Sequence, residues 1–278
     1  MKVDMMKADA MKGSGMPGKI GVKGSWALAV QIIAVTASQN LLIAAPQTLA
    51  EPTAYERLFK EFDAASDAHR KKLREARKGK DQERIETLLK KKIAADFVER
   101  FQAGADAHRG QPESKPYLLW LASHGRYGVG GAEAAVARLV TEFVRDKELG
   151  SLSLLIYLMV DREGYDRQLG LSQLMRIATV NVNAENRAAA HFWRAEILGH
   201  IIASEEAIKQ ALVDLEQVQQ ISQVENLRTR ARNFAYELTH LRIGLPAPEI
   251  EAEDLDGVVF KLSDYRGKVV LLDFWGHW

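Results

Sequence analysis

Residues 254–278 read Asp-Leu-Asp-Gly-Val-Val-Phe-Lys-Leu-Ser-Asp-Tyr-Arg-Gly-Lys-Val-Val-Leu-Leu-Asp-Phe-Trp-Gly-His-Trp. Two extended segments, Glu249–Leu255 and Val258–Leu262, flank Asp256-Gly257, a dipeptide suited to the positive backbone angles of a tight hairpin turn. The nearly continuous apolar run Val269–Trp275 is typical of a central strand buried on both faces. We therefore expect a β-hairpin followed by one core strand.

The C-terminal segment 243–278 resembles the opening of the redoxin group of thioredoxin-like proteins, which includes AhpC/TSA-type and TlpA-like thiol-disulfide oxidoreductases. The resemblance is carried by Gly244-x-Pro246-Ala247-Pro248 and by the stretch from Asp254 to Trp278 quoted above. In that family the sequence continues into Trp-Cys-x-x-Cys, whose first cysteine begins a helix that lowers its pKa. The resemblance implies that Trp278 precedes the nucleophile and that segment 243–278 is an incomplete α/β domain.

The resemblance also separates two activities. Peroxidases of the peroxiredoxin kind carry a Pro-x-x-x-Thr-x-x-Cys motif, whereas disulfide reductases carry tryptophan followed by paired cysteines. The ending Trp275-Gly276-His277-Trp278 favours the reductases. The implied function of the full-length protein is cell redox homeostasis, of an antioxidant type, with a protein disulfide as substrate.

No cysteine occurs among the 278 residues. These residues therefore contain no thiol nucleophile, disulfide or cysteine-ligated zinc. We predict no catalytic, cofactor-binding or metal-binding residue and no cofactor, and expect the chain itself to be inactive. A lone apolar strand without partner strands indicates a fragment or truncated reading frame, and the alternative is a final strand that docks on the helical region.

Residues 51–242 form a region rich in good helix formers. Apolar stripes from Tyr55 to Ala76 and from Ile85 to Phe101, on either side of Gly79-Lys80-Asp81, predict an antiparallel helical hairpin. Further helices are predicted over Pro116–Ser123, Ala132–Lys147, Leu152–Val160, Ala184–Ile202, Glu205–Ser222 and Glu225–Arg242. The expected fold class is mainly α, a helical-hairpin array followed by the incomplete thioredoxin-like domain.

One helix pair has a tetratricopeptide-like spacing. Leu198-Gly199 is followed by Ala211 and then Leu215, which predicts that two helices approach closely at small residues. The large aromatic residue and the closing proline of that repeat are missing. Since helical arrays commonly hold a partner, the alternative to the redox function is a non-enzymatic helical-repeat scaffold that binds a protein.

Residues 1–50 have the features of an export signal. Five lysines precede an apolar stretch from Trp26 to Ala45, and Thr48-Leu49-Ala50 offers a cleavage site of small residues. We predict a signal peptide cleaved after Ala50 and a periplasmic or other extracytoplasmic location. The alternatives are an uncleaved anchor, which would provide the predicted membrane contact, and a disordered leader followed by a core helix.

The net charge of +1 argues against a nucleic-acid partner. Residues 70–92 are dense in lysine and arginine, but acidic residues interleave with them, and we interpret them as a solvated helix face.

Four local patterns resemble sites without matching one. Gly125–Gly131 lacks the lysine of a phosphate loop, and Glu196 with His200 lacks the HExxH arrangement and a third metal ligand. Asp161, Glu163 and Asp166 lack the glycine and terminal glutamate of a calcium loop. We interpret the glycine-rich stretch as an inter-helix turn and Glu196 with His200 as ordinary polar residues. The three acidic residues are interpreted as an acidic turn. The remaining pattern is a set of histidines isolated in sequence: His69, His108, His124 and His240.

Overall fold

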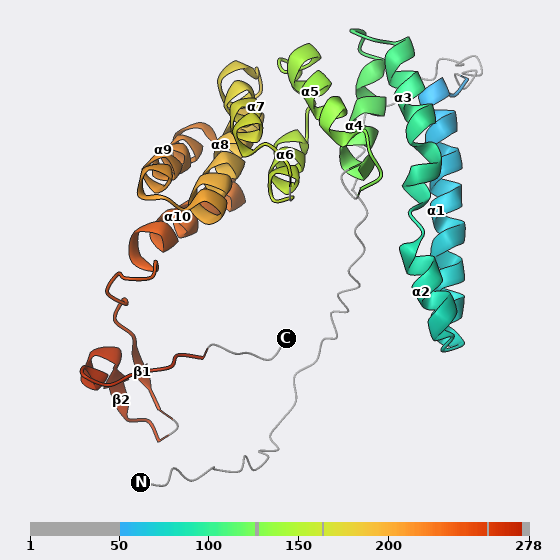
Figure 1. The fold of residues 1–278 in the computed structure, drawn as a ribbon. Helices are drawn as coiled ribbons and strands as arrows, with labels where there is room; N and C mark the ends of the chain where they lie inside the picture. The colour runs from blue at the N-terminus through green and yellow to red at the C-terminus, as the bar shows by residue number, and fades with distance from the viewer. Residues whose placement is uncertain (1–50, 126–127, 163, 255, 274–278) are drawn as a thin grey trace, which may run out of the picture. The chain divides into compact units, whose positions relative to one another are not determined.

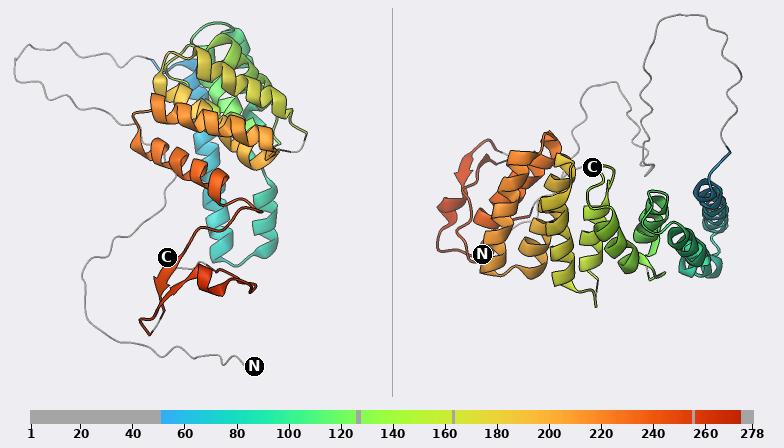
Figure 2. Two further views of the ribbon diagram at one scale, coloured as in Figure 1. Left: turned by 90° about the vertical axis from the view of Figure 1, so that its left-hand side faces the viewer. Right: turned by 90° about the horizontal axis from the view of Figure 1, so that it is seen from above.

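The computed structural model describes residues 51–125, 128–162, 164–254 and 256–273. The predicted signal peptide and the residues Phe274–Trp278 lie outside these ranges. Within them the chain forms ten α-helices and one two-stranded antiparallel sheet. The helices follow one another along the array in chain order, with α2 and α3 one after the other beside α1 (Figures 1 and 2). The expected mainly α fold class is confirmed.

The predicted N-terminal hairpin is present. Helix α1 (Ala54–Lys78) begins at Thr53, whose side chain forms a capping box with Glu56, and packs against α2 (Gln82–Lys90). The second apolar stripe is not one helix, because the backbone is extended at Lys91. It divides into α2, a 3-10 turn (Ile93–Phe97) and α3 (Val98–Ala107).

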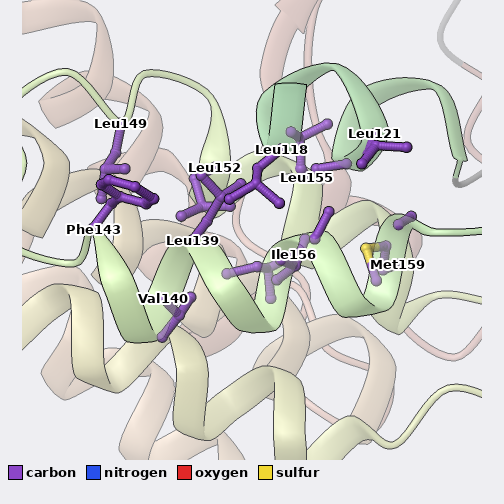
Figure 3. Packing of buried hydrophobic residues seen from close by; sticks show 14 of the residues in the cluster. Leu118, Leu121, Leu139, Val140, Phe143, Leu149, Leu152, Leu155, Ile156 and Met159 are labelled. Carbon is purple, nitrogen blue, oxygen red and sulfur yellow. The ribbon is translucent and has the colours of Figure 1, made fainter. Parts of the chain in front are cut away.

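The main hydrophobic core spans α1 to α8. Helices α4 (Ser114–His124), α5 (Ala132–Glu142) and α6 (Leu152–Val160) bring large aliphatic side chains together. Figure 3 shows these side chains, among them Leu118, Leu139 and Ile156, which are fully buried. Helix α5 ends earlier than predicted, since the backbone leaves the helical conformation at Phe143.

Helix α7 (Arg167–Val180) was not predicted from the sequence. It begins at Asp166, whose side chain caps its first turn. Its apolar side chains Leu174 and Ile177 are buried in the main core. The helix contains Gly170 and several polar residues that weaken its apolar pattern. One of these polar side chains, Gln173, is nevertheless buried.

A second core joins the last helices. It lies among α8 (Ala184–Glu196), a π-helical turn (Ile197–Ile202), α9 (Glu205–Ile221) and α10 (Glu225–His240). Ala211 and Leu215 are buried there together with Leu198, as their spacing predicted. No helix among the described residues has the length and apolarity needed to cross a bilayer.

The C-terminal segment contains the predicted hairpin but not the predicted core strand. Strand β1 (Glu251–Glu253) pairs with β2 (Val259–Lys261), and a 3-10 turn (Leu262–Tyr265) follows. The prediction of a buried strand is wrong for Val269–Asp273, which is not in a strand and whose side chains are exposed. The sheet of the described residues contains β1 and β2 alone, so this run pairs with no strand there, and an apolar strand without partner strands or a covering helix is not stable in water.

Candidate functional site

The segment that resembles redox proteins is organised around the β1–β2 hairpin. Ala252 lies opposite Phe260, and Glu251 lies opposite Lys261, with 3.0 Å between Lys261 Nζ and Glu251 Oε2. The backbone of Leu262 donates a hydrogen bond to the carbonyl oxygen of Ile250 at 2.9 Å. The register therefore continues past the two short strands into the 3-10 turn.

Asp254 closes the hairpin. Its carboxylate Oδ1 accepts hydrogen bonds from the backbone N–H groups of Asp256 and Val258, each at 2.9 Å. Gly257 has a φ of 77°, a conformation that costs glycine little. Gly257 therefore supplies a positive φ to the turn expected at Asp256-Gly257, and Asp254 accepts hydrogen bonds from two amides of the loop.

Two carboxylates hold the 3-10 turn against the hairpin. Glu249 Oε1 accepts a hydrogen bond from the backbone of Ser263 at 3.0 Å, and Asp264 Oδ2 accepts one from the backbone of Lys261 at 2.9 Å. Hydrogen bonds from Ser263 lower the pKa of Glu249. The segment is thus a small hydrogen-bonded unit that positions no nucleophile within the described residues.

The pair Glu196 and His200 acquires a third member in the structure. His200 Nδ1 lies 2.9 Å from Glu196 Oε2, and His200 Nε2 lies 3.0 Å from Glu237 Oε1 on α10. Burial lowers the pKa of His200, but the hydrogen bonds with Glu237 and Glu196 outweigh it and raise that pKa. Both ring nitrogens contact carboxylates, and among the described residues no group of three histidine, aspartate or glutamate side chains, this one included, has an arrangement that could hold a metal ion.

A buried charged cluster escaped sequence analysis. Asp214 on α9, which is 1% exposed, lies with its Oδ1 2.7 Å from His191 Nδ1 and accepts a hydrogen bond from Arg194. His191 and Arg194 are three residues apart on α8, so one helix face presents both to the carboxylate. In the sequence, the one indication of this cluster was the three-residue spacing of His191 and Arg194 on an alanine-rich helix. The cluster joins α8 to α9.

The other two patterns are structural. The glycine-rich stretch 125–131 connects α4 to α5, with Gly130 donating a backbone hydrogen bond to the carbonyl oxygen of Gly125 at 3.2 Å. Asp166 accepts hydrogen bonds from the backbones of Gln168 and Leu169 and so caps α7. The interpretations as an inter-helix turn and an acidic turn hold for their described residues, and Glu163 lies outside them.

The structure does not gather the isolated histidines. His124 packs in an aromatic cluster, 4.6 Å from the Trp120 ring and 4.9 Å from that of Phe62. His240 stacks on Tyr236 at 4.3 Å. His108 stacks on Tyr117 in another part of the array, at 6.3 Å.

Comparison with known proteins finds a short similarity. The chain is 48% identical over 46 residues to the thiol-disulfide oxidoreductase ResA of Geobacillus thermodenitrificans (strain NG80-2). It is 50% identical over 46 residues to the protein of the same name from Geobacillus kaustophilus (strain HTA426). Each match covers 16% of this chain and 26% of the relative, so the chain spans about a quarter of the length of these curated relatives.

No family model matches the chain, and no solved structure matches it. The comparisons therefore support a thioredoxin-like oxidoreductase similarity over a short part of the chain. That similarity agrees with the resemblance expected from segment 243–278, at the level of thiol-disulfide oxidoreductases.

Proposed function

We propose that this chain carries the first part of the redox domain of an exported thiol-disulfide oxidoreductase of the redoxin, TlpA-like kind. The observation that carries the proposal is the 48–50% identity over 46 residues to two proteins named as thiol-disulfide oxidoreductases. The order of motifs from Gly244 to Trp278 supports the same conclusion, as does the hairpin closed by Asp254 and Gly257. The location outside the cytoplasm is supported by the composition of residues 1–50.

The proposed chemistry needs two cysteines that are not among these 278 residues. One thiolate forms a bond to a sulfur atom of a partner's disulfide, and the other sulfur of that disulfide leaves as a thiolate. The second cysteine then displaces the partner from the mixed disulfide. The partner's disulfide gains two electrons, and the two cysteines are oxidised to a disulfide.

The test is the residue sequence that follows Trp278 in the natural protein, read from its coding sequence. We expect a cysteine directly after Trp278 and a second one three residues further on. A coding sequence that ends at Trp278, with no cysteine codons downstream in any frame, contradicts the proposal.

A non-enzymatic scaffold is the second candidate. It is favoured by the extent of the helical region, whose two cores between α1 and α10 contain no residue of the C-terminal segment. This candidate predicts that the protein binds a partner protein through the helices and has no thiol chemistry. It gains support if no cysteine follows Trp278 and segment 243–278 resists proteolysis.

A further inference from the structure

Positive charge is concentrated at one end of the first helical hairpin. Residues 70–92, called the basic tip below, contain eleven basic and four acidic side chains, a difference of +7 in a chain whose total charge is +1. They comprise the last turns of α1, the connecting turn and α2 with the two lysines after it. All eleven basic residues are exposed. The charge is therefore local and faces solvent.

Most of this charge is not neutralised by neighbouring carboxylates. Arg70 forms ion pairs with Asp63 and Asp67, and Lys91 with Asp96. Among the described residues, no acidic side chain lies within ion-pair distance of eight further basic residues of the tip: Lys71, Lys72, Arg74, Arg77, Lys78, Lys80, Arg84 and Lys90. These eight cationic side chains can therefore pair with an anionic partner without first breaking an ion pair within the part of the chain that the structure describes.

Five of the six basic side chains that α1 contributes to the basic tip lie on one face, and Lys72 lies outside it. Arg70, Lys71, Arg74, Arg77 and Lys78 follow the spacing i, i+1, i+4, i+7 and i+8, which covers about 120° of helix surface at 3.6 residues per turn. On the opposite side, Ala76 is buried against the rest of the hairpin. The tip thus presents a continuous cationic surface.

The tip projects from the array. Helix α2 packs chiefly on α1, and the connecting ends of the two helices extend beyond the neighbouring helices in Figure 1 and in the left view of Figure 2. Leu89, in the last turn of α2, is 59% exposed and directly precedes Lys90. Leu89 is thus a large exposed side chain beside the lysine Lys90 of the basic tip, at the end of α2 away from the connecting turn. This combination is suited to an interface that takes up both apolar and cationic groups.

We propose that the basic tip binds the surface of a membrane containing anionic lipids. Anionic headgroups attract clustered lysines and arginines, and the boundary between headgroups and acyl chains accepts an apolar side chain such as Leu89. Single-stranded nucleic acid fits less well, because residues 70–92 contain no aromatic side chain on which a base could stack. A duplex would use the charge through its phosphates but would not require the exposed leucine. An acidic protein would use the charge but would not require the exposed leucine.

The experiment measures co-sedimentation of the full chain with vesicles of phosphatidylglycerol and phosphatidylcholine in equal parts, and with vesicles of phosphatidylcholine alone. The tip variant carries Lys71→Gln, Arg74→Gln, Arg77→Gln and Lys78→Gln, which preserve helix propensity. The matched control removes four exposed charges elsewhere, by Arg145→Gln, Lys147→Gln, Arg162→Gln and Arg167→Gln. Comparing these variants isolates the tip from the lysines of residues 1–50, which all three chains share.

We expect the tip variant to lose affinity for anionic vesicles by about tenfold or more, because each basic residue near such a surface strengthens binding. The control variant should stay within about twofold of the parent chain. Salt at about 1 M, where the Debye length is roughly 3 Å, should abolish the difference between the tip variant and the parent. Circular dichroism spectra identical to that of the parent chain verify that the variants fold. A two-residue variant, Lys71→Gln with Lys72→Gln, should also lose affinity for anionic vesicles, but by a smaller factor.

A third variant, Leu89→Ser, distinguishes a membrane from an anionic polymer. It should weaken binding to anionic vesicles and leave binding to polyglutamate or duplex DNA unchanged. The proposal is overturned if the tip variant and its two-residue form bind anionic vesicles as tightly as the parent chain does. It is also overturned if the tip substitutions abolish binding to polyglutamate or DNA without affecting the vesicles.

Discussion

Asp214 on α9 connects this helix to α8 through hydrogen bonds of its buried carboxylate. Its carboxylate is almost completely buried and is the shared partner of His191 and Arg194. Removing the carboxylate leaves the partly buried guanidinium of Arg194 without its counter-charge and His191 without its hydrogen-bond partner, which costs about 3–5 kcal/mol. Neither the partner nor the burial was evident from the sequence, because the residues that meet are 20 and 23 positions apart.

We therefore predict that Asp214→Ala lowers the free energy of unfolding by about 3–5 kcal/mol, measured by urea denaturation followed by circular dichroism. The matched control on the same helix is Glu206→Ala, whose carboxylate forms an exposed pair with Lys209. That control should change the free energy by less than about 1 kcal/mol. Equal effects of the two substitutions would show that the buried cluster does not stabilise the joint.

His200 makes a second prediction at the same scale. Its pKa is raised in the folded chain, where Glu196 and Glu237 surround it, above the ordinary value of 6.5. The stabilisation by the charged ring is therefore complete below pH 6.5 and is lost as the pH rises through the raised value. Because His200 and Glu237 are largely exposed, solvent keeps this contribution below about 1 kcal/mol.

The variant His200→Gln should consequently reduce the fall in stability that accompanies a rise in pH above 6.5, measured as the melting temperature at several pH values. The control is His240→Gln, which removes a ring that contacts Thr239 and Tyr236. A pH profile of stability that is the same for His200→Gln as for the parent chain would refute the role of His200.

Among the elements, the π-helical turn Ile197–Ile202 depends on a glycine. A Cβ atom added at Gly199 would lie 2.7 Å from Phe234 Cζ and 3.0 Å from Leu238 Cδ2, both on α10. The predicted close approach at Leu198-Gly199 is therefore real, but the helix that approaches Gly199 is α10. Sequence spacing identified a small residue in a contact without identifying its neighbour.

Gly199→Ala should destabilise the chain by about 1–3 kcal/mol, because the added methyl group overpacks this contact. The control is Gly79→Ala, where φ is −76° and the nearest atoms to an added Cβ are 3.5 and 3.7 Å away. That substitution should be neutral or slightly stabilising. Urea denaturation measures the free energy of unfolding of both variants. If Gly199→Ala leaves that free energy unchanged, α10 moves away from the added methyl group without loss of stability, and the prediction is wrong.

The helices were predictable where apolar spacing and end signals agree. Leu152–Val160 has the predicted bounds, and Ala184, Glu205 and Glu225 begin helices as expected. Helix α7 was missed because Gly170 and buried Gln173 obscure its apolar pattern. The strand expected at Val269–Asp273 failed for a different reason, since apolar composition favours a buried strand only when partner strands exist.

At the scale of the whole molecule, the described residues combine a well-packed helical array with an apolar run, Val269–Leu272, whose side chains remain exposed. Val269 and Leu271 are almost completely exposed, whereas large aliphatic residues of the array such as Leu118 are fully buried. Sequence patterns predicted the array and the hairpin, as well as the redox resemblance. They placed Glu196 one turn from His200, but they did not predict the contact of His200 with Glu237 or the cluster around Asp214, which depend on how distant helices meet.

We propose above that this chain carries the first part of the redox domain of a thiol-disulfide oxidoreductase, and reduction of insulin disulfides tests that proposal. The protein is expressed with the residues its gene encodes after Trp278, and turbidity from the released insulin B chain is followed in the presence of dithiothreitol. We expect the extended protein to accelerate the reduction of insulin, and we expect this acceleration to be lost when the first cysteine after Trp278 is replaced by serine. The 278-residue chain should not accelerate the reaction. An extended protein that contains both cysteines, folds, and fails to accelerate the reduction would contradict the proposal.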